Sequence, residues 1–294
     1  IAAGNFNWDY ELFDFLPHYL KTTNTTQRDS LIIQWIQQLG NYTAGKEQKY
    51  PKQAKLTPDL DWIKESQYAP ALSNSLTNIK NARRNNKSYY VQLTPGVHSA
   101  TFTHENPYPK HIYPDAGLRL LSLYRYWNMI QYFFPYKYLI EEDWKSVLKE
   151  FIPTFLNAKN EEEYTLAVLQ LIYRVQDTHA NIWGVNETLM KFFGVNFAPI
   201  ELTYVENQFV VTDFYNSDTS ARKNIAVGDV LVSVNNTSVD VLKEKLLQYA
   251  PASNYPTQLR DVAYQLLRTN DTVINLTYKH GDSLKQFSFK TQPY

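Results

Sequence analysis

The hydrophobic pattern of the chain changes its period near Gly194, and this change constrains the fold more than any other feature. Before Gly194, apolar residues recur at the three- and four-residue spacing of amphipathic helices. After it, short runs rich in Val, Ile, Phe and Tyr alternate with polar residues, as in strands. The sequence therefore predicts an α+β protein, with a mainly helical N-terminal domain at 1–190 and a small β-rich domain at 191–294. The N-terminal part is expected to divide further into subregions 1–113 and 114–190.

The first subregion gives weak signals. Residues 9–40 are expected to form two short helices, the second capped by Asp29 and Ser30 and closed by Gly40. The remaining expectations are a loop at 41–57, a helix at 70–84, a strand at 89–93 and an extended Pro-rich loop at 98–114.

Three stronger helices follow in the second subregion. Asp115 caps the first, and the acidic residues 141–143 favour the N-terminus of the second, which Pro153 should kink or end early. Asn160 caps the third, with Glu163 three residues later in a capping-box pattern. Their apolar residues, tryptophans included, are expected to pack in a core.

The sequence pattern after Gly194 indicates β-hairpins and two helices. The expected elements are strands at 200–205 and 209–214 joined at 206–208, a strand at 230–234, helices at 239–249 and 257–268, and a final hairpin of 273–278 with 284–290.

Composition excludes several classes of protein. The chain has 29 basic and 29 acidic side chains, so its zero net charge gives no electrostatic reason to expect a nucleic-acid partner. It has no cysteine, which excludes disulfides, thiolate nucleophiles and cysteine-bound zinc. No apolar run approaches the length of about eighteen residues needed for a transmembrane segment. The first residues carry no leader pattern, so we expect a protein that never had a signal peptide or has lost it.

A compact turn-and-strand motif lies at 225–235, with the sequence Ile-Ala-Val-Gly-Asp-Val-Leu-Val-Ser-Val-Asn. Gly228 suits a turn that needs positive φ, and Asp229 can accept backbone N–H bonds in that turn. Val230, Val232 and Val234 are then expected to alternate into a core.

This motif resembles the core motif of PDZ domains, with Asn224 and Asn236 where that family usually has Gly. Asn tolerates positive φ better than other non-Gly residues, so both departures preserve the backbone shape. Upstream, the segment Phe193-Gly194-Val195-Asn196-Phe197 matches the loop with which PDZ domains bind a peptide carboxylate through backbone N–H groups. The resemblance implies a PDZ-like small β-barrel domain with helices at 191–294; the alternative for Gly194 is a domain hinge.

The order of a helical front, an Asp177-Thr178-His179 segment and a PDZ-like module is similar to that of the tail-specific, or C-terminal-processing, serine peptidases and the tricorn protease core. Residues 126–136, Asp143-Trp144 and 175–183 also look like exported bacterial members of this family, and the resemblance extends over about 114–294. It implies an exported serine endopeptidase, in the periplasm or at the cell surface, that recognises peptide or unfolded-protein substrates.

In that family the nucleophilic serine lies in a protease domain downstream of the PDZ module, and this chain shows no such segment. The chain is therefore expected to be the non-catalytic front portion of a peptidase, inactive by itself and completed by a downstream protease domain of the same protein. A PDZ-type adaptor without proteolysis is the alternative. A glycan-binding surface protein is a second one, suggested by 23 Tyr and 6 Trp.

The resemblance gives His179 two possible roles. Tricorn-like members place a catalytic His here, which would make His179 a general base and Thr178 its supporting hydroxyl. The processing-peptidase branch uses a lysine instead, so the choice between Ser-His and Ser-Lys chemistry stays open. In the structural alternative, Asp177 and His179 satisfy each other at a helix end.

No metal site or other cofactor is expected. Asp177 and His179 could supply two ligands, but no His-rich motif completes a site. His98, His104 and His111 lie in the Pro-rich loop without helical register.

Overall fold

The structure, a computed structural model, describes residues 6–47, 49–83, 89–97, 99–215 and 219–294. It combines helices with antiparallel sheets, which confirms the predicted α+β class. Two compact units divide the chain, residues 1–139 and residues 140–294, and each is described by itself. The domain limit predicted at 190/191 and the subdivision at 113/114 stay predictions.

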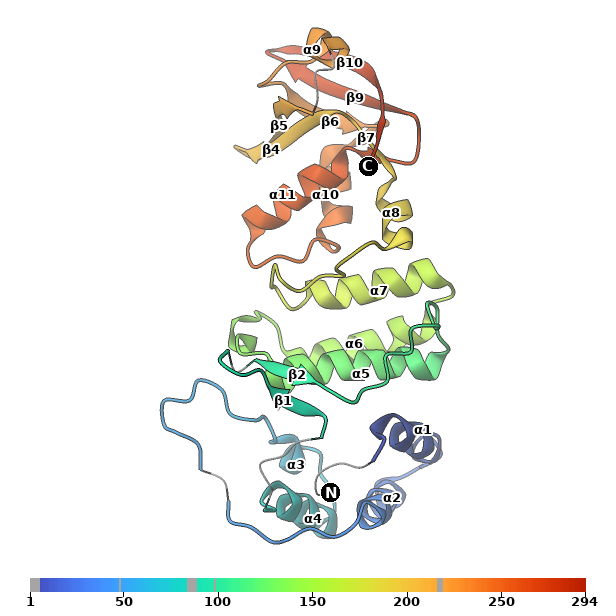
Figure 1. The fold of residues 1–294 in the computed structure, drawn as a ribbon, viewed down its shortest axis with the longest axis vertical. Coiled ribbons are helices and arrows are strands. Elements are labelled where there is room, and N and C mark those ends of the chain that lie inside the picture. The colour runs from blue at the N-terminus through green and yellow to red at the C-terminus, as the bar shows by residue number, and fades with distance from the viewer. Residues whose placement is uncertain (1–5, 48, 84–88, 98, 216–218) are drawn as a thin grey trace. The chain divides into compact units, whose positions relative to one another are not determined.

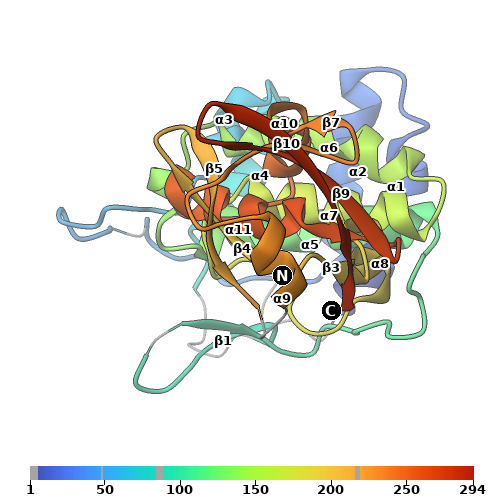
Figure 2. The same cartoon turned by 90° about the horizontal axis from the view of Figure 1, so that it is seen from above.

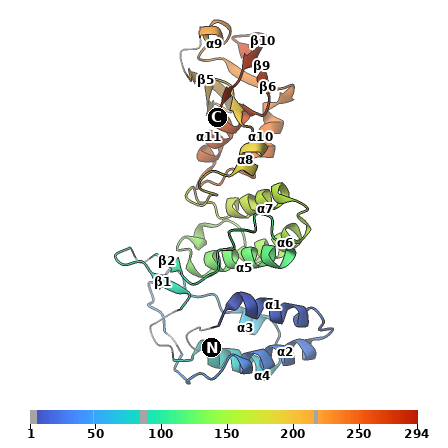
Figure 3. The same ribbon diagram turned by 45° about the vertical axis from the view of Figure 1, so that its right-hand side comes forward.

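The first unit is mainly helical. α1, α2 and α4 pack side by side (Figure 3). β1 lies within the strand predicted at 89–93, whereas its partner β2 lies in the segment 98–114 that was predicted to be a loop. The elements are α1 (Trp8–Tyr19), α2 (Thr25–Gln38), α3 (Trp62–Glu65), α4 (Pro70–Lys80), β1 (Val91–Leu93), β2 (Ala100–Phe102), α5 (Ala116–Phe133) and the 3-10 turn η1 (Lys137–Leu139). The predicted helix 70–84 ends at Lys80, and Arg84 lies outside the described residues.

The predicted start of the second helix is wrong. Asn24 caps α2, because its side chain accepts the Gln27 N–H at 2.9 Å. Asp29 instead lies inside α2 and is buried, where it accepts the Ala69 N–H at 2.6 Å and pairs with Arg28 at 2.7 Å. Its partner is 40 residues away, so local spacing suggested a cap where tertiary contacts made a buried acceptor.

An ion pair between the half-buried Arg125 and the buried Asp9 joins distant segments of the first unit. Nη2 of Arg125 on α5 donates to both carboxylate oxygens of Asp9 on α1, at 2.8 and 2.9 Å. The Tyr108 hydroxyl donates to the same carboxylate at 2.7 Å. Burial raises the pKa of Tyr108, and its bond to Asp9 raises this pKa further. This network attaches the Pro-rich loop to two helices.

The second unit begins with helices and continues into sheets (Figure 1). Neither α8 nor α9 was predicted. The elements are α6 (Trp144–Asn157), α7 (Glu161–Tyr173), α8 (Glu187–Phe193), β3 (Asn196–Phe197), β4 (Ile200–Val205), β5 (Gln208–Phe214), α9 (Thr219–Asn224), β6 (Val230–Val234), β7 (Thr237–Ser238), α10 (Val239–Leu247), α11 (Tyr255–Leu266), β8 (Arg268–Thr269), β9 (Val273–His280), β10 (Ser283–Lys290) and β11 (Gln292–Pro293).

The N-termini predicted for the three helices of 114–190 are confirmed. The side chains of Asp115 and Asp143 accept backbone N–H groups at the starts of α5 and α6. Asn160 accepts the Glu163 N–H at 2.8 Å at the start of α7. α6 runs through Pro153 to Asn157, so this proline does not end the helix early.

The larger sheet has the order β10-β9-β6-β5-β4, with β7 paired to β6 and every pairing antiparallel. The long β9–β10 hairpin forms one edge (Figure 2), and β4 forms the other. Among the described residues no pairing joins β4 to β10, so the predicted small β-barrel is not confirmed as a closed one. A second sheet, β11-β3-β8, holds the segment after α8.

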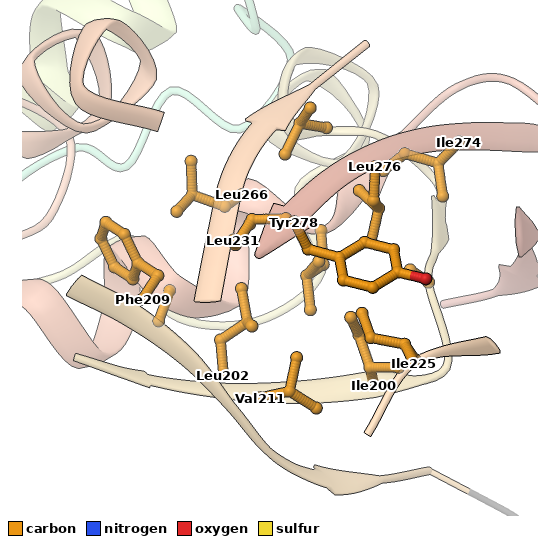
Figure 4. Packing of buried hydrophobic residues seen from close by; sticks show 14 of the residues in the cluster. Ile200, Leu202, Phe209, Val211, Ile225, Leu231, Leu266, Ile274, Leu276 and Tyr278 are labelled. Atoms are coloured by element: carbon orange, nitrogen blue, oxygen red, sulfur yellow. The ribbon is translucent and has the colours of Figure 1, made fainter. Parts of the chain in front are cut away.

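The core of the second unit lies between the larger sheet and the helices α10 and α11 (Figure 1). Ile200, Ile225 and Leu276 surround the ring of Tyr278 (Figure 4). The predicted inward alternation of β6 is wrong in part: Leu231 and Val234 are buried.

A β-bulge explains this change of phase in β6. Leu231 pairs with Tyr278 and Ser233 with Thr277, so Val232 has no opposite residue and the inward face shifts by one position. Val230 and Val232 are consequently only half-buried.

No helix in the described part of the chain is long and apolar enough to cross a membrane.

Candidate functional site

β4 is an edge strand, and its pairing with β5 shows which of its residues turn their backbone groups away from β5. Glu206 and Asn207 form the two-residue turn to β5, both at positive φ, and Val205 pairs with Gln208. The next pair along, Tyr204 with Phe209, is then a non-hydrogen-bonded pair. Backbone groups in such a pair point away from the partner strand, so those of Tyr204 face the open edge.

The same phase holds at Leu202, as contacts on the far side of β5 show. Val211, opposite Leu202, donates its N–H to Asp229 O and accepts from Gly228 N, both at 2.9 Å. These bonds point away from β4, so Leu202 and Val211 exchange none, and the backbone N–H and C=O of Leu202 also face the open edge. Two residues of β4 thus present a donor and an acceptor each, at strand spacing.

The open edge adjoins a cavity of about 700 Å³. Its walls come from β3 and β4, from the outer face of α11, from α8, and from the loop between α7 and α8. Aromatic rings from several of these elements line it, together with four charged side chains; these residues are Phe193, Phe197, Trp183, Tyr215, Tyr249, Tyr264, Tyr294, Glu201, Arg260, Asp261 and Arg268. Cavities with apolar walls and few polar groups are typical of ligand sites.

Arg268 is the half-buried cation of this cavity. Its Nε and Nη2 donate to Gly194 O at 2.8 and 2.6 Å, and its guanidinium lies 4.2 Å from the ring centroid of Tyr294 and 5.8 Å from that of Phe193. Burial lowers the pKa of Arg268, while the nearby Tyr294 and Tyr264 hydroxyls raise it. No carboxylate of the described chain lies within 4 Å of it to form an ion pair.

Two tyrosines on the cavity wall have shifted acidities. Burial raises the pKa of Tyr264, and its bond with Tyr294 raises it further. Burial also raises the pKa of Tyr215, assisted by the charges of Glu201 and Asp213. Both phenols are therefore neutral donors at neutral pH and suit contact with a polar ligand.

In the segment Phe193 to Phe197, predicted to bind a carboxylate through its backbone N–H groups, two of those N–H groups are already hydrogen-bonded within the chain. The Gly194 N–H donates to Met190 O at 2.9 Å, and the Val195 N–H donates to Asn270 Oδ1 at 3.3 Å. Asn196 and Phe197 form β3, between β8 and β11. Phe193 and Phe197 line the cavity, so peptide binding by this segment stays a prediction in which the side chains, rather than these two amides, contact the ligand.

Gly194 is required by its surroundings. Its φ is +115°, and a Cβ built there would lie 2.3 to 2.6 Å from backbone atoms of Thr269. The close approach of β8 therefore excludes a side chain. Together with its carbonyl's bonds to Arg268, this makes Gly194 part of the cavity's framework.

The Asp177-Thr178-His179 segment lies in the loop after α7. The His179 side chain is 96% exposed, and its Nδ1 lies 3.1 Å from Asp177 Oδ1. Trp183 donates its indole N–H to His179 O and is itself 73% exposed, so it does not bury the imidazole. The catalytic role of His179 stays a prediction.

Thr178 does not contact the imidazole. Its hydroxyl lies 3.1 Å from the Ser253 hydroxyl, and the Thr178 and Ser253 N–H groups each donate to the other residue's side-chain oxygen at 3.0 Å. This reciprocal pair attaches the loop to the segment before α11. The predicted supporting role of Thr178 for His179 has no hydrogen bond behind it in this structure.

The predicted turn at Gly228 and Asp229 follows the expected geometry. Gly228 has φ +96° with open space around a built Cβ, so the backbone angle alone calls for glycine. Asp229 accepts the Ala226 N–H at 2.9 Å and pairs with His280 Nδ1 at 2.7 Å. Asn236 has the positive φ expected of it, whereas Asn224 ends α9 without one.

No group of three His, Asp or Glu side chains that could hold a metal ion occurs in the described ranges. His104 stacks on Tyr89 at 4.0 Å, and His111 lies near Tyr108. His98 lies outside the described residues.

Reasoning from sequence missed the open groups of Leu202 and Tyr204 and the role of Arg268. Arg260 and Tyr264 are exposed on α11, but Arg268 lies beyond the end of that helix, in β8. Exposed polar residues are ordinary on a surface helix, so the sequence carries no local signal that marks Arg268 as part of a cavity.

No protein-family model matches the chain, and no curated protein matches it. Among solved structures, mature CPAF complexed with lactacystin is similar to 60% of the chain, with 13% identity, a TM-score of 0.46 and 35% of that protein covered. The photosystem II D1 C-terminal processing protease is also similar to 60% of the chain, with 12% identity, a TM-score of 0.35 and 44% of that protein covered. The chain thus spans less than half the length of these proteins, and likeness of this degree says nothing of chemistry.

Proposed function

We propose that the second unit binds extended peptide segments, which add to the larger sheet as a further strand beside β4. The observation that carries this proposal is the open edge at Leu202 and Tyr204, whose backbone groups face away from β5 next to a cavity with aromatic walls. Strand addition uses such an edge for main-chain hydrogen bonds, while a neighbouring pocket selects side chains. Residues 191–294 would then act as a PDZ-like module.

The opposite edge of the sheet fits this role less well. β10 carries Lys285 and Lys290, and charged side chains on an edge strand discourage pairing with another chain. β4 carries a single charged residue, Glu201, and adjoins the cavity. Of the two edges, β4 therefore offers both the hydrogen bonds and the pocket.

A scan with N-methylated peptides tests strand addition. The probes are unstructured hexapeptides with apolar C-terminal residues, each carrying one N-methyl group, titrated against the 294-residue chain. We expect unmodified peptides to bind at micromolar order, because short peptides lose much entropy on ordering. N-methylation should weaken binding at every second position, where the N–H points at β4, and have little effect between. Uniform loss along the peptide, or no binding of any probe, would contradict the proposal.

We further propose that the whole protein is an exported serine endopeptidase of the tail-specific or tricorn-like type, in which this portion recognises substrate and His179 serves a downstream protease domain. The resemblance of the Asp177-Thr178-His179 segment supports this role. The exposure of the imidazole supports it too, because a general base must be reachable by the nucleophile it serves.

The proposal predicts a difference between the 294-residue chain and the full-length protein. No Ser or Thr hydroxyl of the described residues is hydrogen-bonded to the His179 ring, so the chain alone should hydrolyse no casein above background. In the full-length protein, His179→Ala should lower turnover by roughly a hundredfold or more, while His18→Ala, an exposed imidazole on α1, should change nothing. Full activity of the His179 variant would refute its catalytic role.

A further inference from the structure

Two carboxylates oppose each other on the strand pair that ends in the open edge. Glu201 on β4 is the direct cross-strand partner of Asp213 on β5, and both side chains are exposed. Directly opposite side chains project from the same face of a sheet with Cβ atoms about 5 Å apart, and like charges there destabilise the pairing. Burial raises the pKa of Tyr215, and the charges of Glu201 and Asp213 raise it further, so both carboxylates lie near this phenol. The edge strand thus carries a local charge repulsion beside the cavity.

The described part of the chain supplies no cation to relieve this repulsion. Asp213 Oδ1 accepts the Phe214 N–H at 2.7 Å, but neither acid has a described Lys, Arg or His nitrogen within 4 Å. Two arginines of the same unit have other contacts. The guanidinium of Arg222 lies 4.7 Å from the ring centroid of Phe214, and that of Arg268 donates to Gly194 O. The two carboxylates therefore remain available to a cation from outside.

The open edge determines which residue of an added peptide would meet Glu201. The bulge of this strand pair lies on β5, where Thr212 has no opposite residue, so β4 is regular through Glu201 and Leu202. Since the Leu202 backbone groups face the open edge, those of Glu201 face β5. A peptide residue opposite Glu201 would then belong to a non-hydrogen-bonded pair, in which the facing side chains lie closer together.

An antiparallel peptide beside β4 runs opposite to it, so the residue opposite Glu201 directly follows the one that pairs with Leu202. We propose that this peptide residue is a lysine or arginine and that Glu201 and Asp213 together select it. Neighbouring strands are about 4.8 Å apart, so a long basic side chain extended across β4 brings its charge between the two carboxylates. The inference rests on the proposed strand addition and names the ligand class: extended peptides with a basic residue at one defined position.

Repulsion contributes to this selection as much as attraction does. Charged side chains on an edge strand discourage pairing with other chains. Two like charges side by side discourage a neutral strand, which leaves them unrelieved, and discourage an acidic one more strongly. Only a basic residue converts the repulsion into a favourable contact, and discrimination of this kind is how interfaces reject the wrong partner.

A charge scan of one peptide against the 294-residue chain tests the selection. The parent is an uncharged, unstructured hexapeptide with blocked termini, and its N-methyl scan identifies the residue that pairs with Leu202. Each position in turn carries Lys, or norleucine as an uncharged side chain of similar length, and binding is measured by calorimetry at low ionic strength. We expect Lys directly after that residue to bind about five- to tenfold more tightly than norleucine. Glu there should weaken binding, and Lys elsewhere should change it by less than about twofold.

Matched variants assign the preference to the two acids. Glu201→Gln should remove most of the Lys preference and Asp213→Asn part of it, while the norleucine peptide binds at least as tightly as before. Asp282→Asn is the control, because it removes the same charge from the turn between β9 and β10, at the other edge of the sheet. This variant should retain the full preference.

The outcomes separate the inference from the proposed function. Failure of every peptide to bind overturns both. Binding with the alternating N-methyl pattern but without a Lys preference at the defined position, or with a preference that Glu201→Gln retains, overturns the inference and leaves strand addition intact. Salt provides a readout that needs no variant: the wild-type preference should largely disappear between about 0.02 and 0.5 M sodium chloride, because screening weakens exposed ion pairs. A preference that salt leaves unchanged also overturns the inference.

Discussion

Each unit of the molecule contains a half-buried arginine, and the two guanidinium groups differ in the partners that accept their hydrogen bonds. In residues 1–139, Arg125 donates to both oxygens of Asp9, and the Tyr108 hydroxyl completes the carboxylate. In residues 140–294, Arg268 meets a backbone carbonyl and aromatic rings but no carboxylate of the described chain. An arginine whose carboxylate partner belongs to the same fold contributes to stability, because removing that partner leaves an uncompensated charge. An arginine that makes only some of its possible hydrogen bonds keeps donors available for a ligand, as Arg268 does.

The largest expected effect is the removal of the first arginine's partner. Asp9→Asn removes the closer of the two carboxylates that pair with Arg125 and leaves only Glu105, at 3.6 Å. It should lower the free energy of unfolding by about 3 kcal/mol, measured by urea denaturation. Adding Arg125→Met should recover part of this loss, because it removes the guanidinium that Asp9→Asn deprives of its closest partner. A loss below about 0.5 kcal/mol for Asp9→Asn would show that the pair behaves as a surface ion pair.

Gly194→Ala should come next, because it disturbs the carbonyl that Arg268 holds. The added Cβ would meet Thr269 backbone atoms at 2.3 to 2.6 Å, at a φ of +115°. We expect a loss of about 2 kcal/mol or more, together with weaker peptide binding. Gly184→Ala is the matched control: its φ is +91° with no atom within 4 Å of the added carbon, so it should cost about 1 kcal/mol. Equal losses for the two variants would show that the contact with β8 is unimportant.

Arg268→Gln should cost much less than Asp9→Asn. The variant loses hydrogen bonds to a neutral carbonyl and contact with Tyr294, and it leaves no buried charge behind. We expect a loss of about 1 kcal/mol in thermal or urea unfolding. A loss as large as that of Asp9→Asn would make Arg268 a structural residue like Arg125 and remove the contrast between them.

His179→Ala should have the smallest effect on stability. The imidazole is almost fully exposed and its one side-chain partner is Asp177, so the change should stay within about 0.5 kcal/mol. A clear fall in melting temperature would favour the alternative in which Asp177 and His179 form a structural pair at the end of the helix.

Local signals in the sequence predicted the elements well. The caps at Asp115 and Asn160, the Glu206-Asn207 turn and the strand Val230–Val234 depend on residues within a few positions of each other, and the structure has them all. Errors occurred where a distant partner decides the outcome. Asp29 is a buried acceptor for Ala69 rather than a cap, and a bulge at Val232 reversed the inward face of β6.

The candidate site shows the same division. The sequence drew attention to His179 and to the loop at Gly194, both through short motifs. It could not identify Leu202 or Arg268, because an open strand edge and a missing counter-charge are properties of the folded chain. Whether an arginine is paired depends on residues far away in sequence: 116 positions separate Arg125 from Asp9, whereas no described carboxylate completes Arg268.

Amide hydrogen exchange at β4 tests the central claim most directly. In the free chain, the Leu202 and Tyr204 N–H groups face the open edge and should exchange faster than that of Thr203, which faces β5. Saturation with a bound peptide, followed residue by residue by NMR, should slow exchange at Leu202 and Tyr204 and leave Thr203 nearly unchanged. Peptide binding without added protection at these two amides would contradict strand addition at β4.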